Sequence, residues 1–324
     1  MVGFESSKSR GRTSVTTVKC VGPAQVLLHL DFFMELDKAA IAGAVRIALR
    51  EDVGLGDATT LACVSTDARS IASIRARESM VVAGLEFAEA AFRASSNALR
   101  IQRLAPEGAP IEPGTEVLRV EGPSRALLTG ERVALNFLQR LSGIATLTHA
   151  FVQQLHGTRT VLLDTRKTTP GWRQWEKYAV QCGGGTNHRF GLDDLVLIKD
   201  NHLAALRGQK PNPVAVAVQR ARQFFPALRV EVEADRLEQV RWAIEAGADI
   251  VLLDNFSLPE LAEAVTWIAG RARTEASGGV RLDTVRAIAE TGVDYVSVGA
   301  LTHSARSMDL GLDFLDIDAD EPLS

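Results

Sequence analysis

Residues 240–255, VRWAIEAGADIVLLDN, and residues 285–300, VRAIAETGVDYVSVGA, repeat one pattern along the chain. Valine, arginine, glutamate, glycine, aspartate and a second valine stand at matching places in the two stretches. Each stretch is typical of a helix end, a glycine turn and a mostly apolar strand. Apolar strands of this kind occur in parallel sheets that are covered on both faces. The repeat therefore predicts successive βα units.

Similar strand-like runs recur throughout the second half of the chain, and amphipathic segments separate several of them. They are TVLLDT (160–165), LVLIKD (195–200), LRVEVEA (228–234), DIVLLDN (249–255), RTEASGG (273–279) and DYVSVGA (294–300). Units that repeat with one rhythm favour a closed barrel over an open doubly wound sheet. Six runs are fewer than eight, so the barrel is either short of eight strands or contains strands that the pattern does not reveal.

The first half of the chain has a different pattern. Residues 36–52 have helical apolar spacing, and residues 57–125 alternate short β-like runs with turns, apart from a helix at 86–95. This pattern predicts an α+β block that contains a small sheet. Residues 129–155 then form a long helical pattern, which we expect to be interrupted near Ser142-Gly143 and to lead into the second domain.

The composition limits the classes of protein that fit. The chain has 324 residues, of which 46% are hydrophobic and 23% charged, and its formal net charge is −4. Its length suits one large domain or two ordinary globular domains. The acidic balance argues against general nucleic-acid binding, for which a basic domain is expected. No apolar run reaches the roughly 18 residues of a membrane-spanning helix, so no membrane partner is expected.

The cysteines and the N-terminal stretch bear on location. Cys20, Cys63 and Cys182 are far apart and lack metal-ligand spacing, which indicates free thiols in a reducing compartment. The first thirty or so residues are rich in Ser, Thr, Lys and Arg. This composition is typical of a transit peptide or of a disordered tail that includes vector-derived residues. We expect the tail, and a cytoplasmic protein.

Polar residues gather at the ends of the predicted strands. In an α/β barrel these C-terminal strand ends form the active-site face. The residues are Asp164, Arg166, Lys167, Lys199, Asp200, Glu231, Glu233, Asp254, Ser277 and Gly299. One charged residue at a strand end is usually only solvated, but six strands that deliver them to one rim predict a site.

Cations dominate one part of this rim. Arg166 and Lys167 follow the first strand, and Arg173, Lys177, His188, Arg189 and Lys199 come within the next residues. Guanidinium and ammonium groups bind carboxylates and phosphates, so we expect a small anionic ligand. The alternative is ordinary ion pairing with the nearby acids Glu176, Asp193, Asp194 and Asp200.

Two turns and two acids complete the rim. EASGG (275–279) and SVGALTHS (297–304) each place Ser or Gly after a strand, where backbone N–H groups can hold a phosphate; a plain βα turn is the alternative. Glu233 and Asp254 end successive strands. They can act as acid and base, ligate Mg²⁺ or bind sugar hydroxyls, or form a structural ion pair. Trp172 and Trp175 can stack on a ligand, but we expect them to pack within the protein.

The rim thus fits a substrate with several negative charges, including a phosphate, although the spacing does not name the reaction. A set of motifs resembles the quinolinate phosphoribosyltransferase family over residues 36–315. In chain order the motifs are EDVGLGDATT, ERVALNFLQRLSGIAT, DTRKTTPG, EKYAV, GGGTNHRFGLDD, LIKDNH, EVEA, LLDN and SGG. The family converts quinolinate and phosphoribosyl pyrophosphate to nicotinate mononucleotide, pyrophosphate and CO₂ in de novo NAD synthesis, and it uses Mg²⁺.

The resemblance implies an N-terminal α/β sandwich domain and a C-terminal open α/β barrel of fewer than eight strands. We assign the sandwich to residues 34–145, where the end of the chain is also expected to pack, and the barrel to 146–315. Residues 1–33 and 316–324 are expected to be tails. The resemblance also implies a homodimer in which Arg132 of one subunit reaches the site of its partner.

The resemblance further implies a role for each site residue. Arg166, His188, Arg189 and Lys199 would bind the two carboxylates of quinolinate. Lys167, Glu233 and Asp254 would surround phosphoribosyl pyrophosphate and its Mg²⁺ as catalytic residues, with Glu233 preferred to Glu231 by its distance from Asp254. The 5-phosphate would lie at Ser277, Gly278 and Gly279 and at Gly299, Ala300 and Leu301.

The chain departs from the family pattern in two places. Trp172 and Trp175 stand where leucines are expected, and GQKPNP (208–213) is similar to a short loop insertion. Two rival functions remain. A related transferase with another acceptor would not need the full cationic set. A non-catalytic anion sensor would not need Lys167, Glu233 and Asp254 together.

Overall fold

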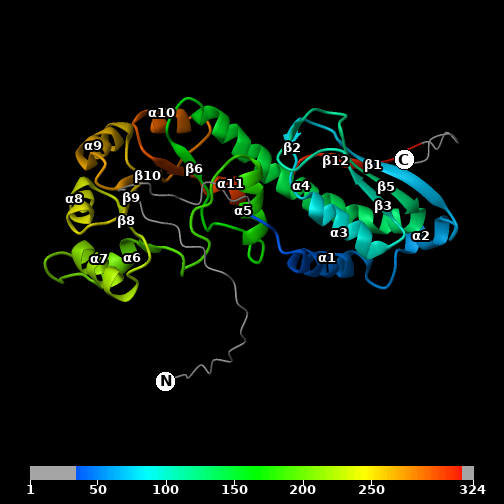
Figure 1. Ribbon diagram of the computed structural model, residues 1–324, viewed down its shortest axis with the longest axis horizontal. Helices are drawn as coiled ribbons and strands as arrows, with labels where there is room; N and C mark the ends of the chain where they lie inside the picture. The colour runs from blue at the N-terminus through cyan, green and yellow to red at the C-terminus, as the bar shows by residue number, and fades with distance from the viewer. Residues whose placement is uncertain (1–33, 316–324) are drawn as a thin grey trace, which may run out of the picture. The chain divides into compact units, whose positions relative to one another are not determined.

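The computed structural model describes residues 34–315, and Figure 1 labels their helices and strands. The predicted tails, 1–33 and 316–324, lie outside the described residues. Within residues 34–315 the strands form one antiparallel sheet, one parallel sheet and a small two-stranded sheet. None of the helices in this part of the chain is both long and apolar enough to cross a membrane.

The antiparallel sheet contains segments from both ends of the described chain. Its four strands pair in the order β12-β1-β5-β3. Their bounds are β1 (Arg69–Ala76), β3 (Arg100–Arg103), β5 (Glu116–Pro123) and β12 (Leu310–Leu315). Strand β12 pairs with β1 from Ile71–Leu315 to Ala76–Leu310, so the last described residues belong to this sheet. The two-stranded sheet consists of β2 (Met80–Val81) and β4 (Pro110–Ile111).

Helices pack with the antiparallel sheet and with one another. Helix α1 (Lys38–Val53) contacts α3 (Leu85–Ser95), which contacts α4 (Ser124–Leu155), and α4 contacts strands β1, β5 and β12. The expected α+β block with helices near 36–52 and 86–95 is therefore confirmed. The sequence pattern missed a short helix, α2 (Ala58–Cys63), which begins where the Asp57 carboxylate accepts the Thr60 N–H at 3.0 Å.

The parallel sheet contains all six predicted strands. They pair in the order β6-β11-β10-β9-β8-β7. Their bounds are β6 (Val161–Leu163), β7 (Val196–Ile198), β8 (Val230–Ala234), β9 (Ile250–Asp254), β10 (Arg273–Ser277) and β11 (Tyr295–Ser297). Strands β6 and β7 are the two edges and do not pair with each other. The open α/β arrangement of fewer than eight strands, which the resemblance implied, is confirmed. The closed barrel that the repeated units alone favoured is wrong.

Helices connect these strands, as βα units require, and Figure 1 shows α7 to α10 around the outside of the sheet. The two repeated stretches fold alike: α8 leads into β9 and α10 leads into β11. The helices are α5 (Arg173–Cys182), α6 (Asp200–Ala205), α7 (Pro213–Phe224), α8 (Leu237–Glu245), α9 (Leu258–Ile268), α10 (Val285–Glu290) and α11 (Ala300–His303). The predicted insertion, 208–213, lies between α6 and α7 and ends at the first residue of α7.

The expected interruption near Ser142-Gly143 is wrong, because α4 is one continuous helix of 32 residues. The two small residues serve close packing instead. A Cβ atom on Gly143 would lie 1.9 Å from the Arg306 carbonyl oxygen. Ser142 Oγ accepts the Ala83 N–H at 3.0 Å. The predicted domain boundary between residues 145 and 146 falls inside this helix.

An aromatic cluster accounts for the two unexpected tryptophans. Trp172 stacks on Phe137 of α4 with ring centroids 4.9 Å apart, and Trp175 contacts Phe87 of α3 edge to face at 5.2 Å. Neither indole lines the cavity described below. As expected, these residues pack within the protein. Trp172, at the end of the loop after β6, and Trp175, in helix α5, contact the helices of the first half.

Candidate active site

A cavity of about 580 Å³ lies at the C-terminal ends of the parallel strands. The loop after β6, the 188–189 segment and the ends of β7 to β11 all contribute to it, as the active-site face of such a sheet predicts. Its lining residues are Thr165, Arg166, Lys167, His188, Arg189, Leu197, Lys199, Glu233, Leu252, Asp254, Asn255, Glu275, Ser277, Gly278, Gly279 and Ser297. Most of the predicted site residues are thus brought together.

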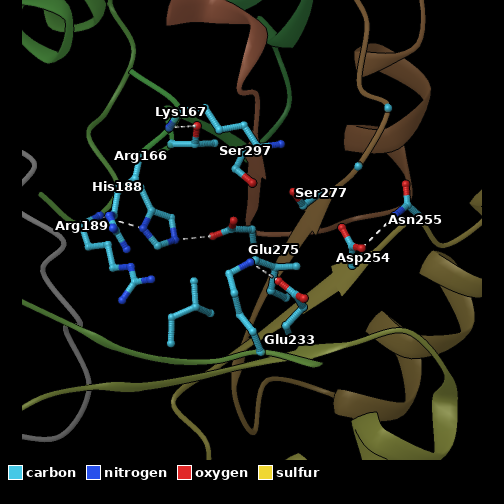
Figure 2. A pocket seen from close by; sticks show the side chains of 16 residues that line it. Arg166, Lys167, His188, Arg189, Glu233, Asp254, Asn255, Glu275, Ser277 and Ser297 are labelled. Atoms are coloured by element: carbon cyan, nitrogen blue, oxygen red, sulfur yellow. Dashed lines mark hydrogen bonds and ion pairs between the residues drawn. The ribbon is translucent and has the colours of Figure 1, made fainter. Parts of the chain in front are cut away.

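The cavity has two chemically different sides. Figure 2 shows Arg166, His188 and Arg189 on one side and Asp254, Asn255 and Ser277 on the other. The first side carries positive charge and the second offers oxygen atoms and a glycine turn. A ligand that fits both must therefore present anionic groups to the first side and hydroxyl or metal-bound groups to the second.

The two arginines have no carboxylate partner within residues 34–315. Arg166 Nε is buried without a hydrogen-bond partner in that part of the chain. There, too, the Arg189 guanidinium donates only to the Leu195 carbonyl oxygen, at 3.2 Å. Burial lowers the pKa of Arg189, and the neighbouring Arg166 lowers it further. The carboxylates of Glu231 and Asp194 offset part of this lowering for Arg189, but neither guanidinium has an ion pair within 4.0 Å among the described residues.

Lysines behave differently at this rim. Lys199 forms an ion pair with Glu233, so it already has a protein partner. Lys167 is exposed and forms no ion pair with described residues. Its stem lies against Gly299, where a Cβ atom would come within 2.8 Å of Lys167 Cδ. The glycine therefore lets the lysine lie close to the start of α11.

His188 has a partner at each ring nitrogen. Its Nδ1 accepts the Arg189 N–H at 2.7 Å, and Nε2 lies 3.1 Å from Glu231 and 3.3 Å from Glu275. Burial alone lowers the pKa of His188, but the two carboxylates outweigh it and raise the pKa to about 10. Because Nδ1 accepts the Arg189 N–H, this geometry places the ring hydrogen on Nε2, where it points to the acids, and protonation of Nδ1 would break the bond to Arg189. Direct binding of a substrate carboxylate by His188 stays a prediction.

Glu275 is a cavity residue that the motif analysis missed, and Glu231 was set aside in favour of Glu233. Both carboxyl groups are buried, and burial followed by the neighbouring Glu275 raises the pKa of Glu231 to about 7. With His188 they form a group whose ligand atoms lie within 4.8 Å of one another. The available signal was an acid near the middle of each of two predicted strands, Glu231 in β8 and Glu275 in β10.

Glu233 and Asp254 end neighbouring strands on the oxygen-rich side. One oxygen of Glu233 pairs with Lys199, and one oxygen of Asp254 accepts the Asn255 amide at 2.8 Å. The other oxygen of each has no partner among the described residues. Carboxylate oxygens of this kind suit Mg²⁺, which usually keeps waters and phosphates as its remaining ligands. The two residues therefore fit the predicted metal.

The Ser277–Gly279 turn requires its glycines. Gly278 has φ +92°, and a Cβ atom there would lie 2.2 Å from the side-chain oxygen of Asn255. Gly279 has φ +59° and nothing within 4 Å of the position that a Cβ would take. Positive φ at little cost is the property of glycine. The turn therefore leaves its backbone open to a ligand such as a phosphate.

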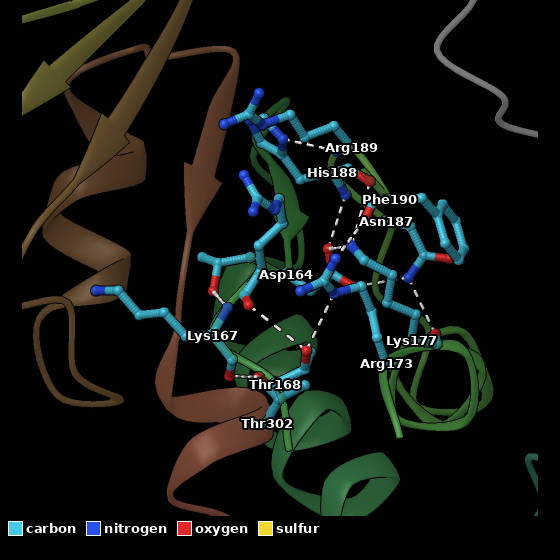
Figure 3. A network of polar contacts seen from close by, with 12 residues as sticks. Asp164, Lys167, Thr168, Arg173, Lys177, Asn187, His188, Arg189, Phe190 and Thr302 are labelled. Atoms are coloured by element: carbon cyan, nitrogen blue, oxygen red, sulfur yellow. Dashed lines mark hydrogen bonds and ion pairs between the residues drawn. The ribbon is translucent and has the colours of Figure 1, made fainter. Parts of the chain in front are cut away.

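Some predicted residues lie elsewhere. Arg132 is exposed on α4 and does not line the cavity, and neither do Gly299, Ala300 and the buried Leu301. Arg173 and Lys177, which the sequence placed among the cations, do not line it either. Both lie on α5, beneath the loops that carry Arg166 and His188 (Figure 3).

Comparisons with known proteins agree along both halves of the chain. The family model described as the quinolinate phosphoribosyl transferase N-terminal domain matches residues 57–142, and that of the C-terminal domain matches residues 144–313. Together these matches span more than half of the chain.

Individual relatives cover nearly the same part. The nicotinate-nucleotide pyrophosphorylase (carboxylating) of Mycobacterium leprae is 42% identical over 85% of this chain and 97% of its own length. The quinolinate phosphoribosyltransferase (decarboxylating) 1b of Nicotiana tabacum is 39% identical over 84% of this chain and 81% of its own. A solved nicotinate-nucleotide pyrophosphorylase from Francisella tularensis has a TM-score of 0.82 and 38% identity, over 88% of this chain and 99% of its own.

Proposed function

The chain belongs to the quinolinate phosphoribosyl transferase family, and from this premise we propose how its cavity performs the family's reaction. Quinolinate and phosphoribosyl pyrophosphate react to give nicotinate mononucleotide, pyrophosphate and CO₂. The enzyme is thus a decarboxylating phosphoribosyltransferase that serves NAD synthesis.

One observation supports this function most strongly. Arg166 and Arg189 face the same cavity as neighbouring cations, and neither has a carboxylate partner in residues 34–315. Two nearby like charges raise each other's energy unless an anion lies between them. A planar guanidinium fits a carboxylate with two parallel hydrogen bonds. A dicarboxylate such as quinolinate would offer one carboxylate to each arginine, and nicotinate would leave one arginine unpaired.

The oxygen-rich side suits the sugar. The quinolinate nitrogen would attack the anomeric carbon of the ribose as the bond from that carbon to the pyrophosphate oxygen breaks. Positive charge develops on the ribose in this transition state, and Glu233 and Asp254, which both line the cavity, would stabilise it. Lys167, which forms no ion pair within the described part of the chain, is free to bind the pyrophosphate. The Ser277–Gly279 turn would hold the 5-phosphate.

Decarboxylation follows the transfer. The ring nitrogen becomes positively charged once it bonds to the ribose, so the electron pair left by departing CO₂ on the adjacent carbon is stabilised. A proton then replaces the lost carboxylate. When bound at Glu233 and Asp254, Mg²⁺ would supply charge neutralisation for the pyrophosphate.

We propose a homodimer in which Arg132 completes the partner's site. Arg125, Thr129 and Arg132 share one face of α4 at spacings of four and three residues. Arg125 donates to the Val64 and Leu61 carbonyl oxygens and Thr129 contacts Asp57, so this face adjoins the exposed Leu61. A second apolar surface, with exposed Leu192, Phe224 and Phe225, borders a groove that shares Arg189 and Leu197 with the cavity. Exposed apolar patches of this kind mark interaction sites.

A cytoplasmic location is also part of the proposal. It rests on the three cysteines, which suit a reducing compartment. In the described part of the chain, Cys63 and Cys182 are both free thiols.

Ligand binding tests the proposed acceptor directly. The thermal midpoint of the purified protein would be followed with quinolinate or with nicotinate, since a ligand that binds only the folded state raises it. We expect clear stabilisation by quinolinate and much less by nicotinate, with turnover of quinolinate only. Equal stabilisation by both acids would contradict the dicarboxylate clamp.

A further inference from the structure

Helix α5 presents three polar side chains beneath the cavity without lining it. Arg173, Glu176 and Lys177 stand at positions i, i+3 and i+4, which share one helix face. The side chains of Glu176 and Lys177 are fully buried. Figure 3 shows Arg173 and Lys177 directed at the two segments that supply the cations of the site. The sequence grouped Arg173 and Lys177 with the cations expected to bind an anion, but the structure points to another role.

Lys177 holds the histidine segment through Asp164. Its Nζ donates to Asp164 Oδ1 at 2.5 Å and to the His188 carbonyl oxygen at 3.2 Å. The same carboxylate accepts the His188 N–H at 2.8 Å and the Asn187 amide at 2.9 Å. Both polar backbone groups of His188 are therefore fixed by one buried ion pair, and its neighbour is fixed as well.

The other two residues of this face hold the loop after β6. Glu176 accepts the Thr169 N–H at 3.0 Å and its hydroxyl at 2.8 Å. Arg173 donates to Thr168 Oγ1 at 3.1 Å and to the Phe190 carbonyl oxygen at 2.9 Å, so it links the two segments. The loop that carries Arg166 and the segment that carries Arg189 thus share one support.

The residues of this α5 face contact the backbone around Arg166 and Arg189 but not the two guanidinium groups themselves. Arg166 and Arg189 make few contacts of their own with the described protein, so their guanidinium groups depend on the backbone that carries them. Bidentate binding of a planar carboxylate tolerates little displacement, and errors of about 1 Å can cost large factors in rate or affinity. The direction of the backbone at residues 187–189 is set at Asp164.

We propose that Asp164 and Lys177 are positioning residues that set the affinity for the dicarboxylate acceptor by fixing the 187–189 segment. This inference rests on the proposed function, because it takes quinolinate as the ligand of Arg166 and Arg189. The pair touches no reacting atom. It acts through His188 and Arg189, and its loss should weaken acceptor binding more than binding of phosphoribosyl pyrophosphate, whose proposed contacts with Asp254 and Ser277 lie on the opposite side of the cavity.

A matched pair of variants tests the proposal. Asp164→Asn keeps the size of the side chain but loses the charge that pairs with Lys177. Asp294→Asn is the control, because Asp294 likewise holds three donors, from Arg273, Thr274 N and Thr274 Oγ1, at the opposite end of the sheet. Steady-state kinetics with each substrate varied, and calorimetric binding of quinolinate, would be measured for both variants and for the wild-type protein.

We expect D164N to raise KM and Kd for quinolinate about 10-fold or more, with kcat and KM for phosphoribosyl pyrophosphate changed less than about 3-fold. D294N should leave all of these constants near the wild-type values, even if it lowers the melting temperature. Unchanged quinolinate constants in D164N, or equal changes in both variants, would overturn the proposal.

A milder variant covers the case in which D164N does not fold. Asn187→Ala removes one donor to Asp164 and leaves the ion pair in place, and it should raise KM for quinolinate about 3-fold. An unchanged constant would then overturn the inference. Absence of turnover in the wild-type protein is a different result, since it would contradict the proposed function itself.

Discussion

Replacing Arg166 tests the proposed function most directly at the scale of a single residue. Replacement by alanine removes a guanidinium whose Nε is buried and without a partner in residues 34–315. A hydrogen bond to a charged group contributes about 1.5–3 kcal/mol, so KM for quinolinate should rise by about 10- to 100-fold. The measurement is steady-state kinetics of R166A with quinolinate varied at saturating phosphoribosyl pyrophosphate.

The control for R166A keeps the charge but changes the geometry. Arg166→Lys retains a cation but not the planar fork that binds a carboxylate with two bonds. We expect its KM for quinolinate to lie between those of the wild-type protein and R166A. Saturation of R166A at the wild-type concentration of quinolinate would contradict the role assigned to this residue.

At the scale of single residues, the motifs identified the surface of the cavity better than its support. Arg166, Lys199, Glu233 and Asp254 lie at or shortly after strand ends, which parallel strands bring to one edge. His188 and Arg189 lie between α5 and β7 and were found through the GGGTNHR motif. Glu275 and the Asp164–Lys177 pair were missed in these roles because their importance lies in burial. A charged residue in a sequence does not reveal whether its partner lies 13 positions away on a helix, as Lys177 does from Asp164.

At the scale of helices, two glycines in similar settings should respond oppositely to alanine. In α4, a Cβ atom at Gly143 would lie 1.9 Å from the Arg306 carbonyl oxygen. Gly143→Ala would therefore push α4 and the Arg306 backbone apart, and it should destabilise the fold by about 1–3 kcal/mol or more. In α1, Gly43 has nothing within 4 Å of the same position. Gly43→Ala should therefore stabilise by about 0.5–1 kcal/mol. Urea denaturation of both variants measures the difference, and equal shifts would contradict the close approach.

The N-terminus of helix α3 donates a hydrogen bond to a buried acid, Glu107, whose raised pKa makes the stability of the fold depend on pH. Glu107 accepts the Leu85 N–H at 2.6 Å, yet burial raises its pKa from the ordinary 4.5 to about 7. The folded state binds this proton more tightly than the unfolded state does. The resulting contribution to the free energy of unfolding is therefore complete below pH 4.5 and is lost as the pH rises through 7. The loss is at most about 3 kcal/mol.

Glu107→Gln removes the titrating group and keeps an oxygen that accepts the same N–H. The free energy of unfolding of E107Q, measured by urea denaturation at pH 5 and pH 8, should fall less over this interval than that of the wild-type protein. Parallel behaviour of the two proteins would mean that Glu107 does not titrate in this range.

Elements with a strong periodic signal were predicted well, and those decided by tertiary contacts were not. The six parallel strands are short runs closed by turns, and amphipathic segments separate several of them, so each was found within a few residues. The expected break in α4 was wrong because small residues can mark close packing as well as a helix end. Helix α2 was missed because six residues, held by an Asp57 cap, give no measurable periodicity.

At the scale of the whole molecule, the dimer proposal makes a quantitative prediction. If each site combines Arg132 of one subunit with Asp254 of the other, Arg132→Ala and Asp254→Ala should each inactivate the homodimer. Subunit exchange between equal amounts of the two variants makes half of the dimers mixed, and each mixed dimer regains one intact site. Activity should return to about one quarter of the wild-type value, as two-fold symmetry requires. No recovery after verified exchange would contradict the proposal that Arg132 acts in the partner's site.

The most direct measurement of the central claim is the fate of the quinolinate carboxylate next to the ring nitrogen. Quinolinate labelled there would be incubated with the protein, phosphoribosyl pyrophosphate and Mg²⁺, and labelled CO₂, pyrophosphate and nicotinate mononucleotide would be followed together. We predict one of each product per quinolinate consumed, no CO₂ without phosphoribosyl pyrophosphate, and no mononucleotide from nicotinate. Mononucleotide formed equally from nicotinate, or no product although quinolinate binds, would contradict the account.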